Sequence, residues 1–161
     1  MELFIYLFAA LFSVLNPIGT VPIFVALTEG YTSAERAKVS LITSINVLII
    51  LLISFFIGQY VLSFFGITIT ALRIAGGIII TSSGFGLLNG NFNKNKGINK
   101  KVQKEVQNRT HIALTPLAMP MLAGPGSISL LIAYYQEHNS TSDIIISTLS
   151  ITVVAVTIYL V

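Results

Sequence analysis

The sequence predicts an all-α membrane protein, a polytopic bundle of spanning helices, and three observations support this. The chain has 161 residues, of which 54% are hydrophobic and 9% charged, whereas soluble domains carry roughly 25% charged residues. Its mean hydropathy is +0.86. The few basic residues are clustered, six of nine lying between Lys94 and Arg109. So few charges could not cover the surface of a soluble globule, so the apolar residues must face lipid or one another.

Five long stretches are nearly free of charge and follow one another as consecutive spanning helices would. A span needs about 20 apolar residues at ~1.5 Å each. The first stretch is too long for a signal peptide and has no basic segment ahead of it. The fifth is still apolar at Val161, so we expect a further span to be missing from this chain. The stretches are Leu3–Thr28, Val39–Phe65, Ile67–Leu88, Ile112–Tyr135 and Ile144–Val161.

The charges of the connecting segments predict the orientation in the membrane. Residues 29–38 and 89–111 are basic, while the segments around Gly66 and at 136–143 have no lysine or arginine. Because basic loops stay in the cytoplasm, we expect 29–38 and 89–111 inside and the N-terminus outside. The net charge of +3 is then an orientation signal, and we expect no nucleic-acid partner.

Several kinds of chemistry have no residues to support them in this sequence. There is no cysteine, which excludes disulfides and thiolate metal sites. The predicted spans contain no aspartate or glutamate that could carry a proton. No phosphate-binding loop, metal-ligand cluster or nucleophile–base pair is present. We therefore expect no enzyme activity, no cofactor and no metal.

All five prolines lie inside predicted spans, where each removes a backbone donor. In hydrocarbon a freed carbonyl is costly unless protein, water or a ligand satisfies it. In the first span Asn16 is a good N-cap and Pro17 a good first helical residue, which predicts a break and a new half-helix. The N–H groups of its first turn would be free to meet an anion. The candidate substrate-binding residues of this break are Asn16, Pro17, Ile18, Gly19 and Thr20.

The fourth span carries a second break signal, the sequence Gly-Pro-Gly followed by serine. We expect another half-helix to begin there, with free N–H groups at Gly126 and Ser127. Half-helix N-termini near the middle of the membrane bind anionic groups in several transporters. The candidate substrate-binding residues of the second break are Gly124, Pro125, Gly126 and Ser127.

The proline spacing of the first span recurs in the fourth, as Pro17-x4-Pro22 and Pro120-x4-Pro125. The second cluster lies three spans after the first, so the two helices enter the membrane from opposite faces. This pattern predicts an inverted 3+3 transmembrane repeat with discontinuous helices 1 and 4; on these residues alone, two unrelated kinks are the alternative. Residues 1–161 then form one transmembrane domain, with repeat one at about 1–90, a basic cytoplasmic linker at 91–111 and a partial repeat two at 112–161.

Other polar and small residues in the spans have structural or functional interpretations. Arg73 either snorkels to the outer interface or pairs with a substrate carboxylate or a gate carbonyl. Ser44 and Asn46 are placed to hydrogen-bond to a neighbouring helix, and Gly76 belongs to a group of small residues that predicts close helix packing. Hydroxyls expected to bond to freed carbonyls are those of Thr20, Ser127 and Ser129.

Three motifs stand in a characteristic order: NPIGTVPIF at 16–24, ALRIAGG at 71–77, and TPLAMP with AGPGSI at 115–128. In this order and spacing they resemble the MarC family of bacterial inner-membrane proteins over essentially the whole chain. The resemblance implies six spans in two inverted repeats, so the last span is absent here. Family members similar to the SnatA transporter move small neutral amino acids such as glycine and alanine. A small zwitterionic solute is therefore the implied partner, and a functional role for Arg73 is favoured.

The helix breaks and the resemblance together predict a secondary transporter of small neutral amino acids. Main-chain N–H groups of the half-helices would bind the carboxylate of the solute, and loosened carbonyls would bind its ammonium. One alternative is a structural or assembly subunit whose kinks only shape helix packing. Another is a passive channel. The coupling ion and the oligomeric state, including a homo-oligomer, stay open.

Overall fold

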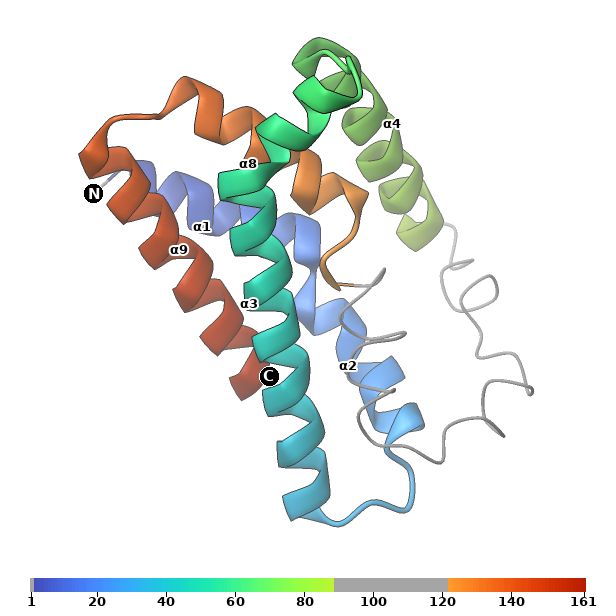
Figure 1. Ribbon diagram of the computed structural model, residues 1–161. Helices are drawn as coiled ribbons and strands as arrows, with labels where there is room; N and C mark the ends of the chain where they lie inside the picture. The colour runs from blue at the N-terminus through green and yellow to red at the C-terminus, as the bar shows by residue number, and fades with distance from the viewer. Residues whose placement is uncertain (1, 89–121) are drawn as a thin grey trace.

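The computed structural model describes residues 2–88 and 122–161, and the regular elements in these ranges are α-helices. The all-α class predicted from the sequence is confirmed for this part of the chain. The helices are labelled as in Figure 1. In chain order they are α1 (Glu2–Leu15), α2 (Pro17–Leu27), α3 (Ser33–Phe64), α4 (Ile69–Leu88), α8 (Pro125–Glu137) and α9 (Thr141–Leu160).

Among the described residues, three helical runs are long and apolar enough to cross a membrane: Glu2–Leu27, which combines α1 and α2, then α3, and α9. α4 supplies a shorter apolar helix, Ile69–Ser82. These runs agree with the predicted stretches to within a few residues, except that α3 begins at Ser33, well before the predicted start. The basic segment 89–111 and most of the predicted fourth span lie outside the described residues.

Polar caps determine where α3 and α9 begin. Thr32 N–H donates to Glu35 Oε2 (2.9 Å), and Glu35 N–H donates to Thr32 Oγ1 (3.4 Å), which forms a reciprocal capping box. At α9, Asp143 N–H donates to Ser140 Oγ at 3.2 Å. These caps satisfy N–H groups that the helix itself leaves without partners, and they explain the early start of α3.

α3 and α9 lie side by side and run in opposite directions (Figure 1). Two serines of α3 donate to backbone carbonyls of α9: Ser44 Oγ to Ala155 O at 2.5 Å, and Ser40 Oγ to Tyr159 O at 3.1 Å. The interhelical bond predicted for Ser44 is therefore confirmed. The side chain of Asn46 has no hydrogen-bond partner among the described residues. Such bonds contribute roughly 0.6 kcal/mol each within a membrane.

The densest packing in the described part lies where α1, α3, α8 and α9 meet. Its side chains are large, apolar and fully buried, and they come from one face of each helix. In a bilayer the surrounding lipid is as apolar as they are, so close van der Waals packing holds them together more than the hydrophobic effect does. The most buried members are Leu7, Leu11, Leu15, Val47, Leu51, Phe55, Leu131, Ile151 and Val154.

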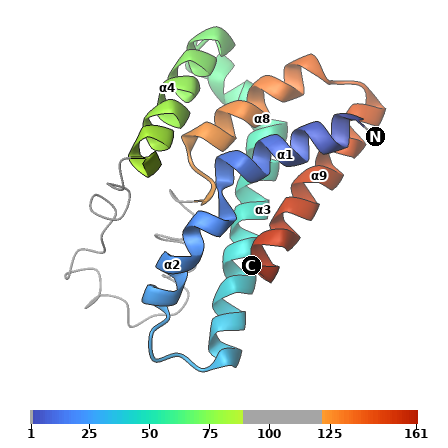
Figure 2. The same cartoon turned by 180° about the vertical axis from the view of Figure 1, so that it is seen from behind.

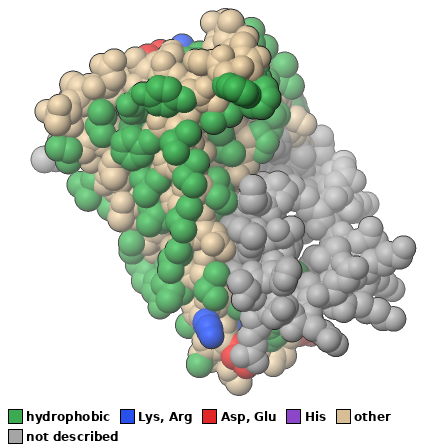
Figure 3. Space-filling model, viewed as in Figure 1, with side chains coloured by type: hydrophobic (Ala, Val, Ile, Leu, Met, Phe, Trp, Pro, Cys, Tyr) green, Lys and Arg blue, Asp and Glu red, His purple; other side chains and the backbone are tan. Residues whose placement is uncertain are grey.

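The opposite face of α3 carries an exposed apolar stripe that recurs every four residues. Leu41, Ile45, Ile49, Ile53 and Ile57 are each about half exposed, at 46–53%. Figure 3 shows hydrophobic side chains over most of the described part of this view, with acidic and basic groups gathered at its upper and lower ends. An apolar belt between two charged ends is the surface expected of a protein embedded in lipid.

α4 packs antiparallel against α8 through small residues. A methyl group at Gly76 would collide with the side chain of Ser129, and one at Gly126 would lie 2.8 Å from Ile80 Cγ1. The close approach predicted for Gly76 is therefore confirmed. Gly77 and Gly84 have no described atom within 4 Å of the corresponding position.

The α4–α8 contact can be tested with a matched pair of glycine substitutions. Gly76→Ala should lower the melting temperature of the protein in detergent, because overpacking of this kind costs roughly 1–3 kcal/mol. Gly77→Ala is the control; it faces open space, and the higher helix propensity of alanine adds up to about 1 kcal/mol of stability. Equal melting temperatures for the two variants, measured by circular dichroism, would contradict the packing.

Candidate functional site: two helix breaks

The first break separates α1 from α2 at a single residue. Asn16 adopts the left-handed conformation (φ 46°, ψ 60°), and it is the only described non-glycine residue with a positive φ. Asparagine tolerates this conformation better than most residues. The chain axis bends here, so that α2 does not continue the line of α1 (Figures 1 and 2). The break predicted at Asn16 and Pro17 is therefore present.

Several backbone groups at this break have no partner. The last hydrogen bond of α1 runs from Asn16 N–H to Phe12 O at 2.9 Å, and Pro17 has no N–H to offer the next carbonyl. The side chain of Asn16 accepts from Gly19 N–H at 3.2 Å, so Gly19, expected to have a free N–H, has its N–H capped. Among the described residues no partner is found for the N–H groups of Ile18 and Thr20, nor for the carbonyls of Ser13, Val14 and Leu15.

Hydroxyl groups satisfy some of the carbonyls that lack a helical N–H partner, as the sequence predicted. Thr20 Oγ1 donates to Pro17 O at 2.6 Å. Pro22, inside α2, offers no N–H to the carbonyl of Ile18. Local side-chain bonds of this kind satisfy carbonyls that the helix cannot reach.

α8 begins at Pro125, the site of the second predicted break, and most of the predicted fourth span before it lies outside the described residues. Gly124 is extended (φ −81°, ψ 173°), Pro125 is the first helical residue, and the first hydrogen bond of the helix runs from Ile128 N–H to Gly124 O at 3.2 Å. Ser127 Oγ also donates to Gly124 O, at 2.9 Å. The N–H groups of Gly126 and Ser127 precede that first bond, so they are left over at the N-terminus.

The break after α1 lies beside the start of α8, because α1 and α8 are antiparallel neighbours (Figure 2). Near the breaks, the missing side chain of Gly126 would lie 3.4 Å from Val14 Cγ1. At the other end, the rings of Tyr6 and Tyr134 stack with centroids 6.5 Å apart. This register brings the C-terminal, negative end of α1 close to the N-terminal, positive ends of α2 and α8.

Arg73 is not brought to the breaks. Its Nη2 donates to Glu137 Oε1 at 2.5 Å and to Ala133 O at 3.5 Å, and the ion pair is about half exposed. Ala133 lies two helical turns, roughly 10 Å, beyond Gly126 along α8. In this arrangement Arg73 pairs with a carboxylate and a carbonyl of the protein itself.

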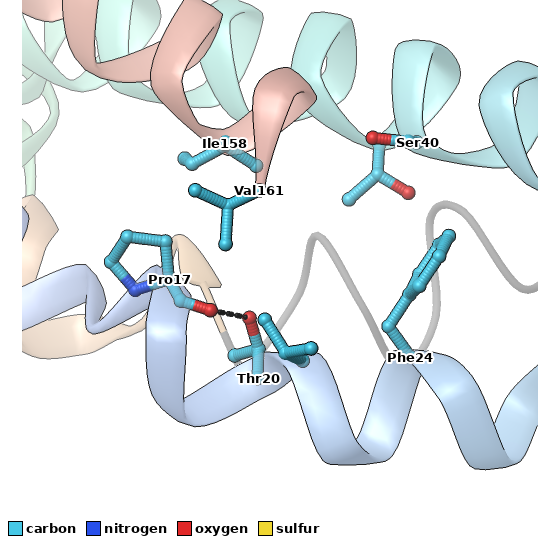
Figure 4. Close-up of a pocket in the computed structure, with 8 residues that line it drawn as sticks. Pro17, Thr20, Phe24, Ser40, Ile158 and Val161 are labelled. Carbon is cyan, nitrogen blue, oxygen red and sulfur yellow. Dashed lines mark hydrogen bonds between the residues drawn. The ribbon is translucent and has the colours of Figure 1, made fainter.

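A small hollow adjoins the first break between α2, α3 and the end of α9 (Figure 4). Its volume is about 40 Å³, enough for water-sized molecules. Sequence reasoning missed Ser40 and Thr43 of its lining; the signal was their spacing of three residues, which places both hydroxyls on one face of α3. The residues around the hollow are Pro17, Thr20, Val21, Phe24, Ser40, Thr43, Ile158 and Val161.

The motifs that surround these breaks are matched over the whole chain, residues 1–161, by the family described as "MarC family integral membrane protein". The chain belongs to the MarC family. Among curated relatives it is 42% identical to a "UPF0056 membrane protein" of Buchnera aphidicola, over 88% of this chain and 65% of that protein. It is 39% identical to YhcE of Escherichia coli K12, over 84% and 62%, and 41% identical to the inner membrane protein MarC of Escherichia coli ATCC 8739, over 73% and 55%.

The chain thus spans about two-thirds of the length of the first curated relatives it matches. No solved structure matches this MarC family chain. Its membership supports the assignment as an integral membrane protein, in agreement with the apolar helices. Chemically, the break at Asn16 and the neighbouring N-terminus of α8 offer N–H groups for an anion and carbonyls for a cation.

The role of Asn16 can be measured through stability. Asn16→Ala should destabilise the protein by about 1–2 kcal/mol, because alanine loses the cap and is strained in the left-handed conformation. Asn16→Gly should cost only a few tenths of a kcal/mol, since glycine adopts that conformation freely. Unfolding titrations in denaturing detergent compare the two; equal losses would show that the backbone at this break is not under the predicted constraint.

Proposed function

We propose that this protein is a secondary transporter of small neutral amino acids such as glycine and alanine. One observation carries the proposal: the break between α1 and α2 lies beside the N-terminus of α8, with unpartnered backbone groups of both polarities. The N–H groups of Ile18, Thr20, Gly126 and Ser127 have no partner among the described residues. In a bilayer such groups persist where a cavity, water or a ligand satisfies them.

A zwitterion matches this arrangement in charge. Its carboxylate would lie against the N-terminal turns of α2 and α8, where the helix dipoles favour negative charge. Its ammonium would lie against the carbonyls at the end of α1, those of Ser13, Val14 and Leu15. The absence of acidic residues from the spans leaves these dipoles as the charge recognition of the proposed site.

Repeated elements support the inverted-repeat architecture that would provide alternating access. Thr32, the N-cap of α3, lies fifteen positions after Pro17, where α2 begins. Ser140, the N-cap of α9, likewise lies fifteen positions after Pro125. Both N-caps are followed three residues later by an acidic residue, Glu35 or Asp143. In this register Pro17 corresponds to Pro125, whereas the proline spacing in the sequence matched it with Pro120.

Orientation and location complete the proposal. The basic segments predict that 29–38 and 89–111 face the cytoplasm and that the N-terminus lies outside. A bacterial inner membrane is supported by the similarity to MarC of Escherichia coli, which is named an inner membrane protein. Transport would proceed by rocking of one repeat against the other, around a solute held at the breaks.

Uptake of labelled glycine and alanine into proteoliposomes tests the proposal. The protein should show saturable uptake, and both Pro17→Ala and Gly126→Leu should reduce it by about tenfold or more. The first restores a backbone donor at the break, and the second fills the space between α8, Ile80 and Val14; a loss of 1.4 kcal/mol of binding is already tenfold. Ser54→Ala is the control, because that buried serine bonds within α3, to Ile50 O.

Each other outcome identifies a rival. Changes in stability or complex formation without any flux in the parent protein would indicate a structural subunit. Flux that rises linearly with solute concentration would indicate a channel. No saturable uptake, with both break variants equal to the parent, would overturn the proposal.

A further inference from the structure

The end of α8 that lies farthest from the breaks contacts three neighbouring helices. Toward α4, Arg73 forms the ion pair with Glu137 and also donates to Ala133 O. Toward α1, the ring of Tyr134 stacks on that of Tyr6, with the two ring planes 19° apart. Toward α3, the ring of Tyr135 packs edge-on against that of Phe55.

The same end of α8 contains polar atoms that are buried without partners. Tyr134 Oη and His138 Nδ1 have no hydrogen-bond partner among the described residues, and neither does Ser147 Oγ of α9. Tyr134 is only 6% exposed, and its ring stacks on that of His138 with centroids 4.3 Å apart. More than nine in ten buried polar groups in proteins have a partner, so these buried groups without a protein partner are unusual and costly in this arrangement.

The other side of the breaks is different. There the hollow between α2, α3 and α9 reaches Pro17 and Thr20 at the first break. On the proposed orientation, the hollow lies on the cytoplasmic side and the fastened end of α8 on the outer side. Among the described residues, the outer side of the breaks thus carries these helix contacts and the inner side carries the hollow.

We propose that the C-terminal end of α8 is the outer gate of the transport pathway, an inference that rests on the proposed function. The ion pair between Arg73 and Glu137 and the stack of Tyr6 on Tyr134 hold it shut. Opening moves this end of α8 away from α1 and α4, so that water reaches Tyr134 Oη and His138 Nδ1. The ion pair favours the closed gate, whereas the dehydrated hydroxyl favours the open one.

These opposed contributions give opposite predictions for two variants. The chain has no cysteine, so Val14→Cys, beside Gly126 at the breaks, is a reporter without background. Its rate of labelling by a membrane-impermeant maleimide, added outside intact cells, measures how often the gate opens. Glu137→Gln should raise this rate about two- to fivefold, the range that an exposed ion pair allows. Tyr134→Phe should lower it by about fivefold or more, since the closed gate no longer buries a hydroxyl.

Matched controls separate the gate from general effects of substitution. Tyr60→Phe removes the hydroxyl of a tyrosine on α3 that is 69% exposed, and Glu29→Gln removes an exposed charge at the opposite end of the molecule; neither should change the labelling rate. The double variant R73E/E137R should return the rate to near that of the reporter protein. Misfolding cannot raise the rate in one variant and lower it in the other, and size-exclusion chromatography checks each protein.

The outcomes distinguish the gate from the transport proposal. Unchanged labelling in both variants, with saturable glycine uptake, would overturn the gate and leave transport standing. An increased rate for Tyr134→Phe would also overturn it. The expected opposite changes in a protein without glycine or alanine uptake would support the gate while removing the proposed substrates.

Discussion

Backbone polarity inside the membrane is the constraint on which the rest of the structure depends. A continuous helix satisfies its own N–H and C=O groups, and proline prevents this wherever it falls in a span. The structure answers with local bonds: Asn16 caps Gly19, Thr20 bonds to Pro17 O, and Ser127 bonds to Gly124 O. These bonds are incomplete, and the groups that remain give the site its chemistry.

The helices around the breaks are held together by two kinds of contact. α3 and α9 are joined by apolar packing and by the bonds of Ser40 and Ser44 to the α9 backbone. α8 is held to α4 by a glycine contact at Gly76 and by the Arg73–Glu137 pair, whose exposure keeps its contribution small. α8 also packs on α3, through the rings of Phe55 and Tyr135 and through Ile132 against Gly58, so it belongs to the same core as α3 and α9.

The sequence predicted the features that depend on local physics. Proline and its neighbours located the break at Asn16–Pro17 and the start of α8 at Pro125, and apolar length located the helices, because both act within a few residues. The bond from Gly19 N–H to Asn16 follows from the predicted N-cap role of Asn16. Of the contacts between helices, the sequence predicted the bond of Ser44 and the close approach at Gly76, but nothing in it paired Arg73 with Glu137 rather than with lipid or a solute.

The two helix starts are not equivalent, and this difference bears on where an anion gains most. At α2 the cap is a side chain, so Asn16 Oδ1 already occupies one donor of the first turn. At α8 the cap is Gly124, which makes no side-chain cap bond. The N–H groups of Gly126 and Ser127, both buried residues, therefore keep the whole positive partial charge of the helix N-terminus available for an anion. A solute carboxylate therefore gains more at α8. Because α8 also ends at the fastened corner with Glu137 and Tyr134, one rigid half-helix connects the tighter half of the proposed site to the proposed gate.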